Sequence, residues 1–196
     1  MKISIIGSAG RKSDGPKMTR ALYMKMVHDA RQQIVIIRER LVLTPSYQSS
    51  EDNKISDTHL ISGGAGWSDH CAISLYLMDL ADSLTLYFPC KWTGSNQSVK
   101  GKISQTERTM RYYHALFSKK MGGNTLAGIQ KAIDKGAVYH EIEGGFLARN
   151  LLVGRTDAVL AYTWGEGDMP KDGGTAHTWS HSDAPIKIHR PLSLLV

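Results

Sequence analysis

Two hydrophobic patterns alternate along the chain. Short apolar runs that stop at glycine, proline or polar residues predict buried strands, and apolar residues that recur every three or four positions predict helices. Runs of the first kind lie at 2–6, 59–62, 84–90, 137–142, 157–164 and 186–189. Helical spacing is found at 17–33, 71–82, 107–119 and 124–135, and further helices are expected to open at 143–150 and 175–179.

Strands that alternate with helices indicate βαβ units. We therefore predict an α/β fold, a single Rossmann-like domain over residues 1–196 with a mainly parallel sheet flanked by helices. Its ligand site is expected at the carboxyl ends of the strands. Residues 34–37 fit either a strand or a continuation of the preceding helix, and the long helix is favoured. Polar stretches at 45–57 and 91–106 predict exposed loops.

Composition narrows the class of protein. The 196 residues are 41% hydrophobic, which suits one core. Cys71 and Cys90 are too few for a disulfide framework or a metal cluster. Neither a signal peptide nor a membrane helix is evident, so no membrane partner is expected and the cytosol is the predicted location. Lys and Arg residues give a net charge of +6 but are scattered, which gives no support for a nucleic-acid partner; a basic pocket for an anionic small molecule fits equally well.

The densest candidate chemistry lies at residues 59–78. An apolar run stops at three glycines within 63–66, and Ser68 and Asp69 then precede a helical pattern, which predicts strand, tight turn and helix. Backbone N–H groups and the positive end of the helix dipole would hold an anion there, typically a phosphate. A plain glycine turn with an Asp or Ser cap explains the same pattern.

Two further glycine turns follow predicted strands. Gly7 and Gly10 come after the first strand, and a glycine-rich stretch follows Trp164. Because the carboxyl ends of parallel strands meet at one edge of the sheet, all three turns are expected at that edge.

This pattern resembles the SLOG superfamily of Rossmann-like nucleotide-binding domains, which includes the lonely-guy phosphoribohydrolases, DNA-processing protein A and ligand-sensing domains of bacterial immune systems. Residues 5–8 match that family's first strand and turn, and 62–69 resemble its central glycine motif in the form that places an acidic residue after the glycines. Residues 146–150 followed by 156–161 are similar to the lonely-guy segment in which a catalytic arginine, here Arg149, precedes a strand.

Gly173, Gly174 and Thr175 resemble the second phosphate-binding motif of that family, with departures. Residues 165–172 intervene between the strand and the motif, and His177 stands near the place of a glutamate that belongs to the family's hydrolytic apparatus. The resemblance therefore implies nucleotide binding more strongly than hydrolysis. It also implies a homodimer.

Arg149 is the strongest single candidate, because a guanidinium binds a phosphate through two parallel hydrogen bonds. The alternative is an exposed helix arginine, and a partly exposed Arg149 would contribute little to stability. Asp69 would either bind a ribose hydroxyl or cap its helix. Gly64 would let a phosphate approach the backbone, so a side chain there is expected to block binding.

Other candidates also have ordinary structural explanations. Glu143 and Glu166 would supply the carboxylate that cleavage of an N-glycosidic bond needs, unless they are solvated loop residues. His177 and His181 are four positions apart but have no third metal ligand at a suitable spacing, so no metal site is predicted. Three tryptophans next to glycine motifs would stack on a base or pack in the core. These are Trp67, Trp164 and Trp179.

Two functions remain open from the sequence. The first is binding of a nucleotide-derived ligand of the ADP-ribose or cyclic ADP-ribose type, with sequestration of a signal. The second is cleavage or exchange of the N-glycosidic bond of a nucleotide, with Arg149, Glu143 and Glu166 as catalytic residues. No cofactor is expected. The predicted ligand-binding residues are Gly7, Ser8, Ala9, Arg11, Gly63, Gly64, Ala65, Trp67, Asp69, Arg149, Asn150, Trp164, Gly173, Gly174 and Thr175.

Overall fold

All six strands run parallel in one sheet of order β4-β3-β2-β1-β5-β6. The structure is a computed structural model that describes residues 1–11, 13–43, 57–95 and 103–196. The predicted loop at 45–57 therefore lies almost wholly outside the described residues, and so does the part of the loop at 91–106 that spans 96–102. The strands are β1 Lys2–Gly7, β2 His59–Ser62, β3 Ser83–Phe88, β4 Val138–Glu141, β5 Ala158–Thr163 and β6 Ile186–Pro191.

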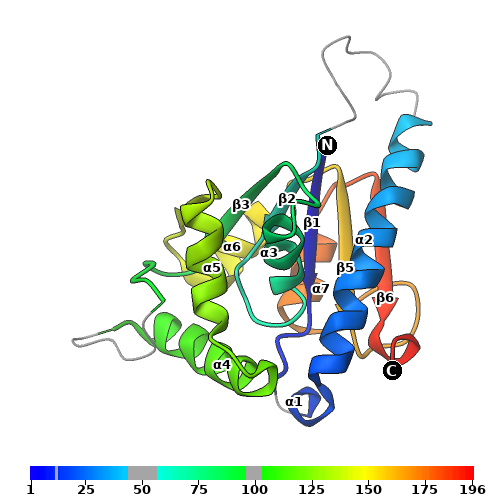
Figure 1. The fold of residues 1–196 in the computed structure, drawn as a ribbon. Helices are drawn as coiled ribbons and strands as arrows, with labels where there is room; N and C mark the ends of the chain where they lie inside the picture. The colour runs from blue at the N-terminus through cyan, green and yellow to red at the C-terminus, as the bar shows by residue number, and fades with distance from the viewer. Residues whose placement is uncertain (12, 44–56, 96–102) are drawn as a thin grey trace.

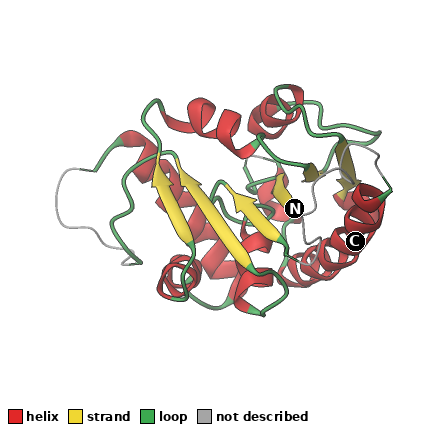
Figure 2. Cartoon of the chain, turned by 90° about the horizontal axis from the view of Figure 1, so that it is seen from above, coloured by secondary structure: helices red, strands yellow, loops and turns green. Residues whose placement is uncertain are grey.

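Helices cover both faces of this sheet, as Figure 1 and Figure 2 show. The predicted α/β class with a parallel sheet is thus confirmed. The helices are α1 Asp14–Lys17, α2 Arg20–Val42, α3 His70–Leu77, α4 Gln105–Met121, α5 Thr125–Asp134, α6 Gly145–Val153 and α7 Gly173–Ser180, and a 3₁₀ turn, η2, spans Leu192–Leu194.

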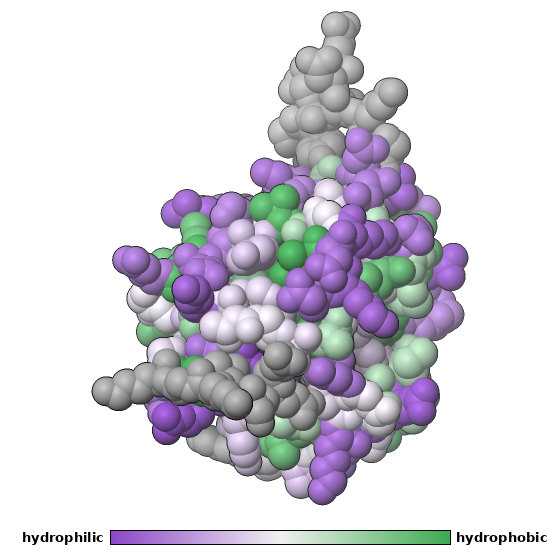
Figure 3. All heavy atoms as spheres, turned by 60° about the vertical axis from the view of Figure 1, so that its left-hand side comes forward, coloured by the Kyte–Doolittle hydropathy of each residue, from purple (hydrophilic) through white to green (hydrophobic). Residues whose placement is uncertain are grey.

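The pleat of the strands divides the core between the two faces. On β1, Ile3 and Ile5 pack into a large cluster with residues of α2, α3, α4 and α5, whereas Ile6 packs with Val153 of α6 on the opposite face. Successive side chains of a strand point to opposite faces, and strands buried on both faces are apolar throughout. Mainly polar side chains cover the outside over α4 and α5, with small hydrophobic areas between them (Figure 3).

The long-helix interpretation of residues 34–37 is confirmed, because α2 runs on to Val42. Ile34, Ile37 and Leu41 are buried and continue the apolar face of the helix at helical spacing. Side-chain caps mark the starts of α2 and α4: the Thr19 hydroxyl accepts from the backbone N–H of Leu22, and the Ser104 hydroxyl accepts from that of Glu107.

The strand order places a switch point beside β1. The chain moves from β1 outward through β2, β3 and β4, and then returns to β5 on the other side of β1. In open parallel sheets, ligands bind in the crevice outside the carboxyl ends of the strands at such a point. The glycine turns after β1, β2 and β5 all leave this edge of the sheet, as predicted.

Candidate functional site

A buried ion pair joins the turn after β2 to α6. The Nη1 atom of Arg149 donates to Oδ2 of Asp69 over 3.1 Å, and both side chains are more than nine-tenths buried. The guanidinium lies directly over Gly63, where an added Cβ would come within 1.2 Å of Nη1. Gly63 therefore lacks a side chain because Arg149 fills that space.

Burial acts against both charges of this pair. It raises the pKa of the Asp69 carboxyl, while the Arg149 guanidinium and the backbone N–H groups of Ala65 and Gly7 act in the opposite direction. Burial also lowers the pKa of Arg149, against the pull of Asp69. The buried Nε atom of Arg149 has no hydrogen-bond partner among the described residues. A buried donor without an acceptor is costly, so this N–H is suited to an external acceptor.

A second arginine lies beside the pair. The guanidinium carbon of the exposed Arg11, in the turn after β1, lies 5.1 Å from the ring centre of Tyr113 on α4 and 5.4 Å from that of Phe146 on α6. The Arg149 guanidinium carbon lies 5.9 Å from the centre of the same Phe146 ring. Arg11 is close enough to disfavour the charged form of Arg149 and so lower its pKa. The charge of Arg149 is thus favoured by Asp69 and opposed by Arg11.

These groups enclose a small hollow of about 20 Å³ at the carboxyl edge. A hollow of this size has room for about one water molecule. The residues that line it are Ala9, Arg11, Gly63, Ala65, Gly66, Pro89, Met110, Tyr113, His114, Phe146 and Arg149.

Two buried histidines, His114 on α4 and His70 on α3, lie with their ring centres 5.9 Å apart. His114 connects the turn after β2 to α5. Its Nε2 atom is 2.8 Å from the carbonyl oxygen of Gly64, and its Nδ1 atom is 3.0 Å from the hydroxyl of Thr125. We assign the tautomer in which Nε2–H donates to the carbonyl, so Nδ1 accepts from the hydroxyl. Burial lowers the pKa of His114 to about 4 and that of the neighbouring His70 to about 3.

The structure brings together five of the predicted ligand-binding residues around this hollow. They are Ala9, Arg11, Gly63, Ala65 and Arg149. Sequence reasoning missed Tyr113 and Phe146. The position of Phe146, three residues before Arg149 on one helix, was an available signal, because such residues share a helix face. Tyr113 had no local signal, since α4 meets this edge only in the folded chain.

Several predicted roles at the central turn need correction. Trp67 does not face a ligand: its ring is buried in the core against Phe117 at 4.5 Å between centres. An added Cβ on Gly64 would come within 2.6 Å of the Phe88 ring, so this glycine accommodates the core. Asp69 stands at the N-cap position of α3 without a side-chain cap bond, because its carboxylate pairs with Arg149 instead.

The interpretation of Arg149 as an exposed or partly exposed residue is also wrong, since its side chain is 8% exposed. Ser8, at the end of β1, has its hydroxyl engaged with Asp14 at 2.6 Å. Gly7 lies against the carbonyl oxygen of Tyr162, only 2.0 Å from where a Cβ would stand.

The remaining predicted residues do not line this hollow. Glu143 and Glu166 are exposed loop residues. Gly173, Gly174 and Thr175 open α7, where the Asn150 amide donates to the Gly174 carbonyl oxygen over 3.1 Å. The Trp164 ring is half-buried beneath the Lys17 ammonium, 5.1 Å from its centre. Their predicted ligand contacts stay predictions.

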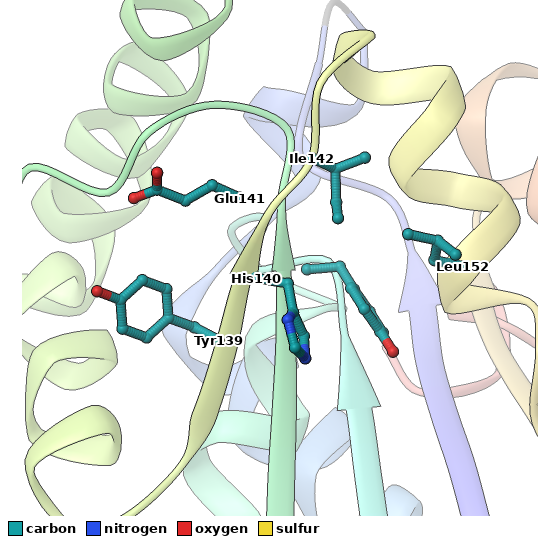
Figure 4. A pocket seen from close by; sticks show the side chains of 6 residues that line it. Tyr139, His140, Glu141, Ile142 and Leu152 are labelled. Carbon is teal, nitrogen blue, oxygen red and sulfur yellow. The ribbon is translucent and has the colours of Figure 1, made fainter.

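A larger and more open hollow lies beside β4, with a volume of about 630 Å³. Figure 4 shows Tyr139 and Glu141 on one side of the strand, and His140 and Ile142 on the other, toward Leu152 of α6. The Tyr87 and His140 rings stack 5.3 Å apart. This hollow holds no arginine or lysine and no buried donor without a partner among the residues described there.

Two further features of the described parts of the chain bear on function. No group of three or more His, Cys, Asp or Glu residues there could hold a metal ion. The His177 and His181 rings stack 4.3 Å apart, as two residues of one helix face do. No helix within these parts is both long and apolar enough to cross a membrane.

Comparisons with known proteins give one relative over the full chain. No family model matches the sequence, and no solved structure matches the fold. Uncharacterized protein R261 of Acanthamoeba polyphaga mimivirus is 29% identical over 196 residues, which cover 99% of this chain and 97% of that protein. The similarity therefore extends over almost the whole chain, including the segments that contain the three glycine turns.

Proposed function

We propose that the protein binds a nucleotide-derived anion, of the ADP-ribose or cyclic ADP-ribose type, at the carboxyl edge of the sheet beside β1 and β2. The observation that carries this proposal is the charge arrangement around the small hollow. Arg11 and Arg149 contribute two positive charges, Asp69 contributes one negative charge, and the buried Nε–H of Arg149 lacks an acceptor among the described residues. A phosphate oxygen would supply the missing acceptor and the second negative charge.

Two features of the chain support the same edge. The switch point of the sheet falls between β1 and β5, next to this site, and the SLOG-like motifs at 5–8, 62–69 and 146–150 meet at the site. Membership of that superfamily and the homodimer it implies are part of the proposal. Sequestration of a signalling nucleotide is the role that we propose for this binding site.

Binding is favoured over N-glycosidic cleavage by the positions of the carboxylates. Glu143 and Glu166 are exposed and do not line the hollow. Asp69 does approach it, but its carboxylate already pairs with Arg149. General base catalysis needs a carboxylate within hydrogen-bond reach of the attacking water, and both predicted glutamates lie outside that position.

Calorimetric titration with ADP-ribose, cyclic ADP-ribose and AMP tests the proposal. Arg11→Ala is the informative variant, because Arg11 is exposed and its removal leaves the buried pair intact. We expect its affinity to fall about tenfold or more, the loss of a charge-assisted hydrogen bond. Arg155→Ala, another exposed arginine close to the end of α6, is the matched control and should bind as the wild type does.

Chromatography of the ligand after denaturation of the protein separates the two functions. Recovery of the intact nucleotide supports binding, and release of the free base supports the enzyme. Equal affinities of Arg11→Ala and Arg155→Ala, or no binding of any of the three nucleotides, would contradict the proposed site.

A further inference from the structure

Tyr113 and Phe146 flank the mouth of the small hollow from two different helices. Tyr113 belongs to α4 and Phe146 to the first turn of α6, and both rings line the hollow. Both are half-buried, so part of each ring is available at the surface. The Arg11 guanidinium contacts both rings, at 5.1 Å and 5.4 Å from their centres.

A guanidinium is flat and delocalised, and it stacks on aromatic faces in much the same way as a nucleobase does. The Arg11 guanidinium lies close to both rings, where the planar group of a base would also contact them. Pro89 and Met110, which line the same hollow, give it apolar walls, and apolar walls with a few polar groups are typical of sites for small molecules.

The hollow is too small for a base while Arg11 stays in place, since its volume is about 20 Å³. Movement of Arg11 would cost little. The side chain is exposed, and each of its two ring contacts is worth about 0.5–1 kcal/mol at an exposed site.

We propose that Tyr113 and Phe146 form a base slot, which the Arg11 guanidinium fills in this structure and which receives the planar base of the nucleotide. Arg11 then turns toward the phosphate held at Arg149. This inference rests on the proposed function and deepens it, because it assigns the selection of a nucleotide over a phosphorylated sugar to these two rings. A stacked ring contacts the base without reading its edge, so the slot selects for a base of any identity.

Titration with AMP and with ribose 5-phosphate tests the slot, because the two ligands differ by the base. The wild type should bind AMP more tightly than ribose 5-phosphate. Tyr113→Leu should weaken AMP binding about 5-fold to 100-fold, the range for loss of one base stack, and should change ribose 5-phosphate binding less than about twofold. Phe146→Leu should act in the same direction.

Two control variants separate stacking from folding. Tyr139→Leu changes an exposed tyrosine of β4 that does not line the hollow, and should leave both affinities unchanged. Tyr113→Phe keeps the ring and should retain AMP affinity within about twofold. Thermal melts without ligand show whether Tyr113→Leu is folded, and Phe146→Leu carries the test if it is not.

The outcomes distinguish the slot from the site. If the wild type binds both ligands equally, or if Tyr113→Leu weakens both to the same extent, the slot is wrong while the anion site stands. If the wild type binds neither ligand, the proposed function fails and the slot fails with it. Loss of AMP affinity alone in both Tyr113→Leu and Phe146→Leu supports the slot.

Discussion

Two hollows at the carboxyl edge of the sheet differ in almost every property that matters for binding. The hollow beside β4 is large and open, about 630 Å³, and it is lined by Tyr87, Tyr139, His140, Glu141, Ile142 and Leu152. The hollow beside β1 and β2 is small, about 20 Å³, and it contains both arginines of the proposed site. The larger hollow has room for a ligand, but no arginine or lysine among the described residues lines it to bind an anion. The smaller hollow is lined by two arginines and is filled by one of them, Arg11.

The difference shows how the chain uses its glycines. The glycines at 63 and 64 leave space for protein groups, the Arg149 guanidinium and the Phe88 ring. They leave room for a buried charge pair at the carboxyl edge of the sheet, and that charge pair distinguishes the small hollow from the large one. Substitutions in the small hollow and in the large hollow should therefore have different effects on stability.

The largest effect is expected when the buried pair is broken. Arg149→Ala leaves the Asp69 carboxylate buried without its partner, so the free energy of unfolding should fall by about 3–5 kcal/mol. Chemical denaturation measures it. His140→Ala in the large hollow is the control and should cost less than about 0.5 kcal/mol, because that side chain is exposed. Equal losses in the two variants would show that the pair is not the structural centre of this edge.

A smaller effect is expected from crowding the same pair. Gly63→Ala places a Cβ on the Arg149 guanidinium, which must move away from Asp69. We expect a loss of about 1–3 kcal/mol, the usual cost of overpacking, and a matching loss of ligand affinity. Gly123→Ala is the matched control, since nothing lies within 4 Å of its Cβ position. If the Gly63→Ala protein were as stable as the Gly123→Ala protein, the Arg149 guanidinium would not lie over Gly63.

The buried histidines His70 and His114 predict that the free energy of unfolding depends on pH. Their folded-state pKa values, about 3 for His70 and about 4 for His114, lie below the ordinary 6.5. The unfolded chain therefore binds more protons than the folded chain between pH 6.5 and 4, and stability present above pH 6.5 is lost as the pH falls. At pH 5 each ring should lower the free energy of unfolding by about 2 kcal/mol relative to pH 7.

His70→Leu isolates one ring of the two. The Nδ1 atom of His70 has no hydrogen-bond partner among the described residues, so an apolar replacement should cost little at neutral pH. Thermal melts from pH 7 to pH 5 should fall less steeply in this variant than in the wild type. His28→Gln, an exposed position on α2, should keep the wild-type slope. A His70→Leu protein with an unchanged slope would assign the acid sensitivity to other groups.

The sequence predicted the fold class and the order of the strands and longer helices well. Apolar runs that stop at glycine, proline or polar residues located β1 to β6, and helical spacing located the longer helices, because each pattern reports local geometry. Element ends were less well predicted: the helix expected at 71–82 ends at Leu77, where Asp79 takes a positive φ of 58°. Such an end depends on packing and not on a glycine signal.

The site was predicted in part. Arg149 and the glycine turn were located, since both lie in short local motifs. The partner of Arg149 and the rings of Tyr113 and Phe146 could not be paired from sequence, because 80 positions separate Asp69 from Arg149 along the chain and only the fold joins them. Trp67 was predicted either to stack on a base or to pack in the core, and the structure buries its ring in the core, with a positive φ of 60°.

The most direct measurement of the central claim is the NMR resonance of the Arg149 Nε–H group on addition of AMP. This N–H is buried and has no acceptor among the described residues, so a phosphate that binds there must change its surroundings. The resonance is assigned by its loss in Arg149→Lys. We predict that AMP shifts the Arg149 and Arg11 Nε–H resonances and leaves that of Arg155 in place. Binding of AMP with no shift at Arg149 or Arg11, or shifts confined to residues of the β4 hollow, would contradict the account.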